Sequence, residues 1–547
     1  MDLGKRDAPL FDRNAPAYRR KLWVRLEGPG ETVHVVFRWR RIVPVLLLLA
    51  LAGWLAAAGV VYAFVRVRHE FSAASYWNLA WPPRWPEHRR ALGQHYLARG
   101  RTALAAGNFI DAAQDFGAGV RRVPDDRPAR RELAMIYLRF GQPHAALDLL
   151  AVGLDEARGD LDYLKLAFGL LDETQEDARI LELAQKYLPA APDEILAHQF
   201  IALQAATACF HRGNYDAAEK TIADWRLDRS LEGQLLLARC DWERGYPDLA
   251  LVRLEQQRER FPTRDELPLQ LIRFHRELGH NEQALDEALL RHVADPASPG
   301  PRIDLLYAWQ KKNDLPRLHR EVESYLQDNA ADPNALLLLA WFAADTRDLA
   351  LARRVRDLAA ARGFPLSGHE LVLVQILVTR GDYREALAAA EVALQGPAGR
   401  EPRFAAVLSG LRALACFGAG DPVNGEGYLR PFLLREHLRA SDALLLAGHL
   451  NEIGARPQAR RVLLTAVLND PMNQAALTEL VRLETTAATP AGLEEYLPRL
   501  LAMRKPSRAV LQEAYLKLDE ATPARAALRH SIKRALANSP TTPEPGL

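Results

Sequence analysis

The chain has 547 residues and a formal net charge of +2, and 49% of its residues are hydrophobic. This length accommodates several ordinary domains or one long array, and the balanced charge gives no reason to expect a nucleic-acid partner. The three cysteines, Cys209, Cys240 and Cys416, form neither a disulfide framework nor a zinc motif. We expect all three to be small buried side chains, with a Cys209–Cys240 bridge as the alternative.

Residues 1–41 form a basic arm that contains the stretch KLWVRLEGPGETVHVVFRW. Apolar runs lie on both sides of a Gly/Pro turn, a pattern that predicts a β-hairpin. An unstructured basic arm is the alternative, since isolated hairpins are marginally stable in water.

Residues 42–65 carry no charge over 24 positions. A helix of that length crosses the hydrocarbon layer of about 30 Å, so we predict a single transmembrane helix. A cleaved signal peptide fits less well, because the apolar run is too long and starts after 41 residues. The cluster RWRR precedes the run, and the positive-inside rule therefore predicts a cytoplasmic N-terminus, although Arg66 and Arg68 reduce the bias. In a bacterium, the C-terminal part would then lie in the periplasm, anchored in the inner membrane.

Residues 66–92 form a juxtamembrane linker that includes YWNLAWPPRWPEHRR. Tryptophans favour the membrane–water interface. A continuing helix, however, would carry Trp77 about 18 Å beyond the apolar run. We therefore expect this segment to pack against the first repeat helices, with Pro82, Pro83 and Pro86 forming a stiff extended spacer. A proline-rich docking site for a partner is the alternative.

A single pattern recurs over residues 93–475. A turn residue, usually glycine, ends one apolar helix and starts a second, and left-handed backbone geometry suits that position. From position 245 to position 381 the step is 34 residues each time. The turn positions are Gly107, Gly141, Gly213, Gly245, Gly279, Asn313, Arg347, Gly381, Gly420 and Gly454.

Small residues follow each turn, where two helices must approach closely. These positions are Ala112, Ala146, Ala178, Ala218, Ala250, Ala284, Ala352, Ala386 and Ala459, with Leu318 and Gly425 as departures. A proline often stops the second helix, as at Pro124, Pro262, Pro296 and Pro471. Each unit is a helical hairpin that buries its apolar face only by stacking on its neighbours.

This pattern resembles the tetratricopeptide repeat (TPR) family, and the likeness is greatest in residues 127–160. Leu133, Ala134, Tyr137, Gly141 and Ala146 sit near the family motif there. The resemblance implies an all-α fold, a TPR-like α-solenoid of about ten helical hairpins. With the single transmembrane helix predicted from residues 42–65 before it, this accounts for most of the chain. Residues 476–537 lose the period and are expected to form capping helices, followed by a disordered tail at 538–547.

The concave groove is the candidate binding site, because the resemblance implies that the first helix of each unit lines it. Counting back six residues from the turns places one residue per unit in the groove. These residues are Met135, Thr207, Arg239, Arg273, Tyr307, Trp341 and Gln375. The last five form a basic-to-aromatic stripe suited to an acidic or extended peptide with apolar anchors. The alternative is that Tyr307 and Trp341 only fill the inner packing layer.

No catalytic, cofactor-binding or metal-binding motif was found in the sequence, so we expect no enzyme activity and no cofactor. We expect a membrane-anchored scaffold that binds proteins through its concave face and the lipid bilayer through residues 42–65. Assembly of a bacterial envelope, secretion, pilus or polysaccharide-export machine is the expected setting. The alternative is an accessory subunit that presents substrate to a separate membrane enzyme of cytochrome maturation or glycan synthesis.

Overall fold

The structure is a computed structural model that describes residues 23–27, 33–37, 39–68, 71, 74–155, 157–396, 399, 402–435, 439–487, 491–519 and 521–538. The chain divides into two compact units, residues 1–157 and 158–547. Of the predicted tail 538–547, only Asn538 is among the described residues, as the last residue of a helix.

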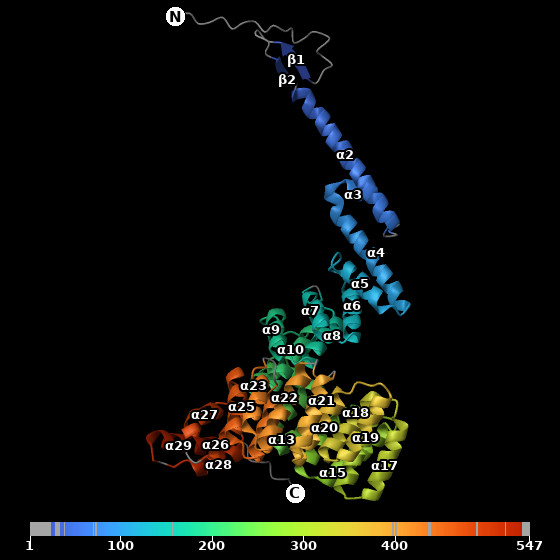
Figure 1. The fold of residues 1–547 in the computed structure, drawn as a ribbon. Helices are drawn as coiled ribbons and strands as arrows, with labels where there is room; N and C mark the ends of the chain where they lie inside the picture. The colour runs from blue at the N-terminus through green and yellow to red at the C-terminus, as the bar shows by residue number, and fades with distance from the viewer. Residues whose placement is uncertain are drawn as a thin grey trace, which may run out of the picture. The chain divides into compact units, whose positions relative to one another are not determined.

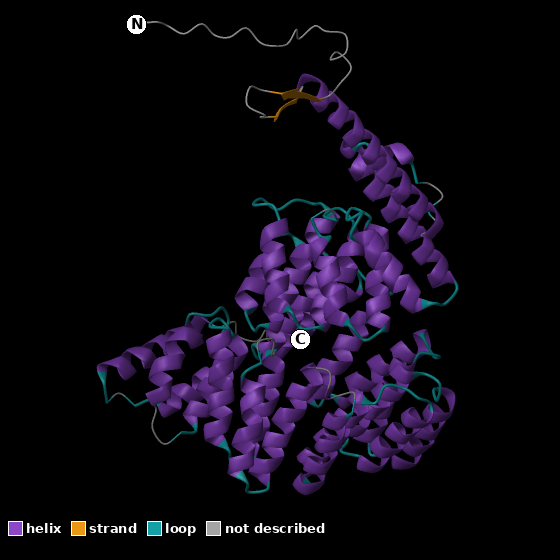
Figure 2. Ribbon diagram, turned by 45° about the horizontal axis from the view of Figure 1, so that its top comes forward, coloured by secondary structure: helices purple, strands orange, loops and turns teal. Residues whose placement is uncertain are grey.

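The first unit contains two strands and then only helices (Figures 1 and 2). The strands pair antiparallel, with Trp23 opposite Phe37 and Glu27 opposite Val33; the predicted turn between them lies outside the described residues. The elements of this unit are β1 (Trp23–Glu27), β2 (Val33–Phe37), α2 (Trp39–Arg68), α3 (Tyr76–Ala80), the short 3₁₀ helix η1 (Pro82–Arg84), α4 (Trp85–Ala105), α5 (Phe109–Val120), α6 (Arg127–Arg139) and α7 (Pro143–Val152).

Helix α2 carries the predicted membrane span. Its stretch Ile42–Val67 is long and apolar enough to cross a membrane, and most of its large apolar side chains are exposed. Exposed apolar side chains over that length are what a lipid-facing helix requires. The stretch is therefore a candidate membrane anchor.

The prediction of an extended proline spacer after this helix is wrong. Pro82 and Pro83 lie in η1, and Pro86 lies in the first turn of α4. The fixed φ of proline suits the first turn of a helix, where its missing N–H removes no bond. The segment packs on α2, since the Trp54 indole donates to the Ala80 carbonyl at 2.7 Å. It also packs on the first repeat hairpin as predicted, since the Phe71 ring lies 5.0 Å from the His95 ring of α4 and Arg89 donates to the Arg121 carbonyl at 3.1 Å.

The second unit is an array of helical hairpins. Its elements are α8 (Leu161–Glu173), α9 (Asp177–Tyr187), α10 (Leu196–His211), α11 (Tyr215–Asp224), η2 (Leu227–Arg229), α12 (Leu231–Glu243), α13 (Pro247–Arg258), α14 (Glu266–Leu278), α15 (Asn281–Ala294), α16 (Pro299–Lys311), α17 (Leu315–Asp328), α18 (Pro333–Asp345), α19 (Leu349–Ala361), α20 (Ser367–Arg380), α21 (Tyr383–Gln395), α22 (Pro402–Gly418), α23 (Pro422–Leu433), α24 (Ala440–Glu452), α25 (Arg456–Asn469), α26 (Gln474–Thr485), α27 (Ala491–Leu501), α28 (Arg508–Lys517) and α29 (Pro523–Asn538).

All ten predicted turn positions adopt the left-handed conformation, with φ between +56° and +83°. Eight of them are glycines, which adopt it without steric cost. Asn313 and Arg347 adopt it despite a Cβ atom, with φ of 57° and 56°. The period read from the sequence therefore marks the tight turn inside ten hairpins, and it misses the turn between α8 and α9, where Gln175 has a φ of 61°.

The predicted small positions are buried where hairpins stack, with one exception. Ala112, Ala146, Ala218 and Ala250 are fully buried, and so are their counterparts in later units. Ala178 is exposed, so that prediction is wrong. Helix α9 starts at Asp177 and turns Asp177 and Ile180 inward instead.

Polar residues at the hairpin turns cap the second helices. The Asn108 side chain accepts from the Asp111 backbone N–H, and Asn214 accepts likewise from Ala217. Such caps each stabilise a helix by about 1 kcal/mol. The same role falls to Asp314, Asp348, Asp421 and, before first helices, to Asp126, Asp160, Ser230, Asp332 and Asn473.

The three cysteines are free and buried, which agrees with the prediction of structural side chains. Burial raises the pKa of the Cys240 thiol to about 12 and that of Cys209 to about 11. A thiol with so high a pKa holds little thiolate at neutral pH and is chemically inert.

Candidate functional site

The five predicted groove residues lie on the first helices of five consecutive hairpins, α12, α14, α16, α18 and α20. Arg273 is exposed, and Trp341 is 36% exposed. Arg239, Tyr307 and Gln375 are partly buried. Of the two earlier positions, Met135 on α6 is exposed and Thr207 on α10 is partly buried.

At the basic end of the stripe, the structure brings Arg239 and Arg273 into electrostatic contact. Burial lowers the pKa of Arg239, and the charge of Arg273 lowers it further. The Arg239 guanidinium lies 4.2 Å from the centre of the Phe210 ring, while Arg273 pairs with Glu277 at 2.9 Å. A cation placed over an aromatic face is attracted to it. Arg239 is therefore held in place by the Phe210 ring.

At the aromatic end, Tyr307 is held by its neighbours. Among the described residues, no hydrogen bond or ring contact joins it to Trp341. Its hydroxyl donates to Asp345, and the Arg276 guanidinium lies 3.5 Å from the centre of its ring. The ring also meets Phe342 edge-on at 4.9 Å. Tyr307 therefore fits the packing role that was its alternative, and Trp341 presents the more accessible aromatic surface.

The groove face of the early hairpins is covered by the chain itself. Ala475 of α26 belongs to the same apolar cluster as Cys209 and Phe210 of α10. A cavity of 330 Å³ lies between Glu243 of α12 and helices α24 to α26. Burial raises the pKa of Glu243, against the nearby charge of Arg273. The open part of the groove thus starts after α12.

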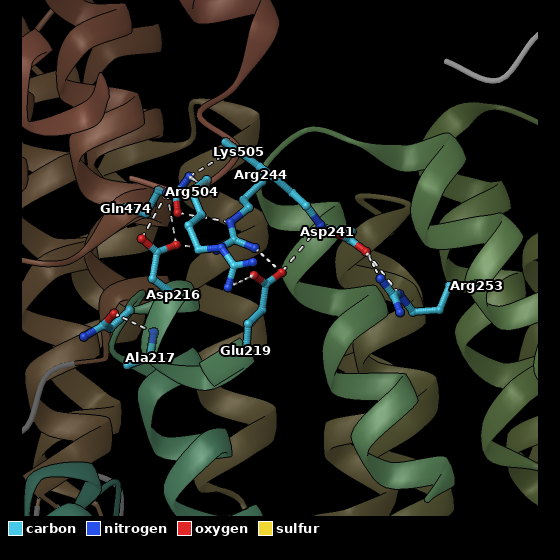
Figure 3. Close-up of polar contacts among 10 residues, drawn as sticks. Asp216, Ala217, Glu219, Asp241, Arg244, Arg253, Gln474, Arg504 and Lys505 are labelled. Carbon is cyan, nitrogen blue, oxygen red and sulfur yellow. Dashed lines mark hydrogen bonds and ion pairs between the residues drawn. The ribbon is translucent and has the colours of Figure 1, made fainter. Parts of the chain in front are cut away.

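Charged side chains close this contact across more than 200 residues of sequence (Figure 3). The Arg244 side chain is 0% exposed, and its guanidinium pairs with Glu219 at 2.5 Å and Asp216 at 2.6 Å. Its Nε donates to Gln474 Oε1 at 3.1 Å. The Arg244 side chain therefore joins α11 and the end of α12 to the start of α26.

The loop between α27 and α28 completes the cluster. Lys505 Nζ lies 2.7 Å from Asp241 Oδ1, and Asp241 also pairs with Arg253 at 2.9 Å. The Arg504 backbone N–H donates to Asp216 at 3.0 Å. We call these residues the closure cluster: Asp216, Glu219, Asp241, Arg244, Arg253, Gln474, Arg504 and Lys505.

Further contacts lie on both sides of the closure cluster. The Gln474 backbone N–H donates to the Gly213 carbonyl at 2.8 Å, and the Tyr246 hydroxyl donates to the Pro506 carbonyl at 2.9 Å. Arg439 pairs with Asp177 at 3.1 Å. The C-terminal hairpins are therefore fastened to helices between α9 and α13, and the predicted capping region takes part through the loop between α27 and α28.

His211, the last residue of α10, lies inside this contact. Burial, together with the charges of Arg439 and Arg239, lowers its pKa to about 4. Asp172 lies 3.7 Å from its Nε2 and acts in the opposite direction. His211 is therefore neutral in the folded chain at neutral pH.

Sequence reasoning missed the closure cluster. Arg244 of the cluster, and Arg212, whose guanidinium pairs with Asp470, each precede a turn glycine. An arginine at a helix end is ordinarily explained by the helix dipole. The repeated Arg-Gly pair was the sequence feature that could have pointed to the closure cluster. It does not indicate which residues the arginines would contact. Among the described residues, no group of His, Cys, Asp and Glu is arranged to hold a metal ion.

Comparison with known families identifies the hairpins. The tetratricopeptide repeat family model matches residues 103–167, which include the turns at Gly107 and Gly141. Residues 103–167 therefore match the tetratricopeptide repeat. Outside the matched region, the TPR assignment rests on the shared turn geometry and spacing.

Curated relatives match part of the chain. The chain is 28% identical over 216 residues to a mouse protein named DnaJ homolog subfamily C member 3, covering 36% of this chain and 41% of that one. The human protein of the same name is 28% identical over 215 residues, and the bovine one 29% over 210, with the same coverage. The chain thus spans about 41% of the length of the curated relatives it matches.

Two solved structures are similar over longer stretches but at low TM-score. Yeast Tom70 is 12% identical with a TM-score of 0.36, covering 75% of this chain and 96% of that one. A chain of the APC/C hetero-tetramer Cut9–Hcn1 is 13% identical with a TM-score of 0.27, covering 82% of this chain and 98% of that one.

Proposed function

We propose that this protein is a membrane-anchored TPR scaffold that binds extended segments of partner proteins in the open part of its groove. The observation that carries the proposal is the accessible surface on α14 and α18. Arg273 and Trp341 are exposed there, whereas the equivalent faces of α10 and α12 contact α24–α26. TPR arrays serve as protein-binding surfaces, and Trp and Arg are the residues most often found at binding hot spots.

The chemistry of this surface defines the ligand. Trp341 offers an apolar face, and Arg273 offers an exposed guanidinium whose ion pair is with Glu277 of its own helix. A carboxylate on the ligand would compete with Glu277 for Arg273, since exposed pairs within a helix are weak. We therefore favour an extended peptide with an apolar side chain and an acidic residue.

Replacing Trp341 with alanine should weaken partner binding by about 2 kcal/mol, or roughly 30-fold, because a central aromatic contact is lost. The partner is first captured by a photo-crosslinking residue at position 341 in the full-length protein in its membranes. Val392, which is exposed on α21, provides the control position. Identical adducts from both positions, or an affinity unaffected by the alanine, would contradict the groove as binding site.

We further propose that α2 crosses the inner membrane of a bacterium with the TPR array in the periplasm, where it takes part in assembly of an envelope machine. The arginines before Ile42 support the orientation, and the array suits the holding of several partners. A reporter active only outside the cytoplasm, fused to Leu547, should give a signal, and a cytoplasm-only reporter should not. The reverse result would place the groove among cytoplasmic proteins.

A further inference from the structure

The chain turns back along its candidate membrane helix. Successive residues of α3 meet successively earlier residues of α2, so the two helices run antiparallel. The Tyr76 ring meets Tyr62 edge-on at 6.2 Å, and its hydroxyl donates to the Leu55 carbonyl at 3.0 Å. At the far end of α3, the Trp54 indole donates to the Ala80 carbonyl at 2.7 Å.

The point of closest return lies in the middle of the apolar stretch. Trp54 is 12 residues from Ile42 and 13 from Val67, or about 18–20 Å from either end at the rise of an α-helix. The Trp85 ring, at the start of α4, lies 6.0 Å from the Trp54 ring. A bilayer that surrounds the apolar stretch would therefore also surround the turn between α3 and α4.

The backbone of this turn is paired internally. The Leu79 carbonyl accepts from the Trp85 indole at 3.0 Å, as the Ala80 carbonyl does from Trp54, and the Trp81 carbonyl accepts from the Arg84 backbone N–H at 2.9 Å. The Trp81 and Trp85 backbone N–H groups bond to the Trp77 and Pro82 carbonyls.

The prolines complete the pairing, since Pro82, Pro83 and Pro86 have no N–H to satisfy. Backbone groups in hydrocarbon must find partners within the protein, whereas an ordinary surface turn relies on water. A turn whose carbonyls accept from two indole donors can enter hydrocarbon without leaving those carbonyls unpaired.

The outer surface of the turn is aromatic. Trp77, Trp81 and Trp85 are 62%, 59% and 49% exposed, and they continue the exposed apolar surface of α2. Arg84 is exposed at the tip. The indole rings present large apolar areas to lipid chains, and the charge of Arg84 requires water or local thinning of the bilayer at the tip of the turn.

We infer that residues 76–86 form a re-entrant turn that inserts into the leaflet on the C-terminal side of α2, with lipid as the occupant of its tryptophan face. This inference rests on the proposed membrane anchoring by α2. It replaces a soluble linker by a second membrane contact, which would restrict rotation of the array about its anchor.

Cysteine accessibility in the full-length protein tests the inference. The purified protein is placed in phosphatidylcholine nanodiscs, whose two faces are both open to a charged maleimide. Single variants Trp81→Cys, Leu47→Cys and Ile110→Cys report on the turn, the apolar helix and an exposed position of α5. The unsubstituted chain measures background from the three buried native cysteines.

We expect Trp81→Cys and Leu47→Cys to react at least about tenfold more slowly than Ile110→Cys, because a thiol in hydrocarbon does not ionise. All three should react equally in SDS. If Leu47→Cys is protected and Trp81→Cys reacts like Ile110→Cys, the re-entrant turn is refuted while the anchor stands. If Leu47→Cys also reacts rapidly, the anchor itself fails. Protection of Trp81→Cys in native membranes but not in nanodiscs would assign the surface to a protein partner and overturn the lipid assignment.

Discussion

Replacing Arg244 with alanine should destabilise the TPR array by about 3–5 kcal/mol, the usual cost of leaving buried charges unpaired. Arg244 is the buried cation that faces Glu219 and Asp216, and Glu219 is itself nearly inaccessible. Lys505 and Arg504 lie farther from Glu219, at 3.6 and 3.5 Å, and would compensate only in part. Urea unfolding of the detergent-solubilised protein, followed by tryptophan fluorescence, measures the loss.

An exposed ion pair provides the matched control for this variant. Arg354 pairs with Glu323 on the surface, and Arg354→Ala should change the stability by less than about 1 kcal/mol. Equal effects of the two substitutions would show that the closure cluster contributes no more than an ordinary surface pair.

Substitutions at two turn glycines distinguish the stability contributed by the contact with α26 from the stability of the turn itself. Gly213→Ala and Gly279→Ala should each cost about 1–2 kcal/mol, because both positions have positive φ. A Cβ at Gly213 would also lie 2.2 Å from Asn473 Oδ1, whereas the space at Gly279 is open. The additional loss at Gly213, about 1–3 kcal/mol, reports the contact between the α10–α11 turn and the start of α26. Equal losses would mean that this contact is absent in solution.

Acidification should destabilise the array through His211, by about 3 kcal/mol between pH 6.5 and pH 4. Burial, together with Arg439 and Arg239, lowers the pKa of this imidazole to about 4 from its ordinary value of 6.5. Above pH 6.5 the ring is neutral in both states and the stability is fully present. As the pH falls below 6.5, the unfolded chain binds a proton that the folded chain does not accept, and stability is lost until about pH 4.

The His211→Gln variant isolates this contribution, because glutamine does not titrate. The free energy of unfolding of the variant should depend less steeply on pH between 6.5 and 4 than that of the natural chain. Any loss of packing appears equally at every pH and does not affect the slope. Parallel pH profiles for the two proteins would show that His211 is solvated and titrates normally in the folded state.

Much of the local architecture was determined by the sequence itself. The turn residues at a step of 34 recur because each hairpin needs a left-handed residue, and Gly245 and Gly279 meet that need in any array. Alanines such as Ala218 and Ala250 mark the close approach of paired helices, and a charge-free run marks a helix long enough to cross a membrane. These signals depend on neighbours within one or two turns of helix, so they are visible in a short window of sequence.

The contacts that define the candidate sites were decided only by the tertiary structure. Arg244 meets Gln474 because small rotations between successive hairpins accumulate over seven units, and the repeat pattern is the same whether the array closes or stays open. Likewise, the sequence of residues 76–86 suggests a spacer. Only the structure shows that the chain reverses after α2 and that Ala80 contacts Trp54. Local periodicity specifies the hairpins. Which hairpins meet depends on the packing angles between all successive hairpins, and no single repeat determines the sum of those angles.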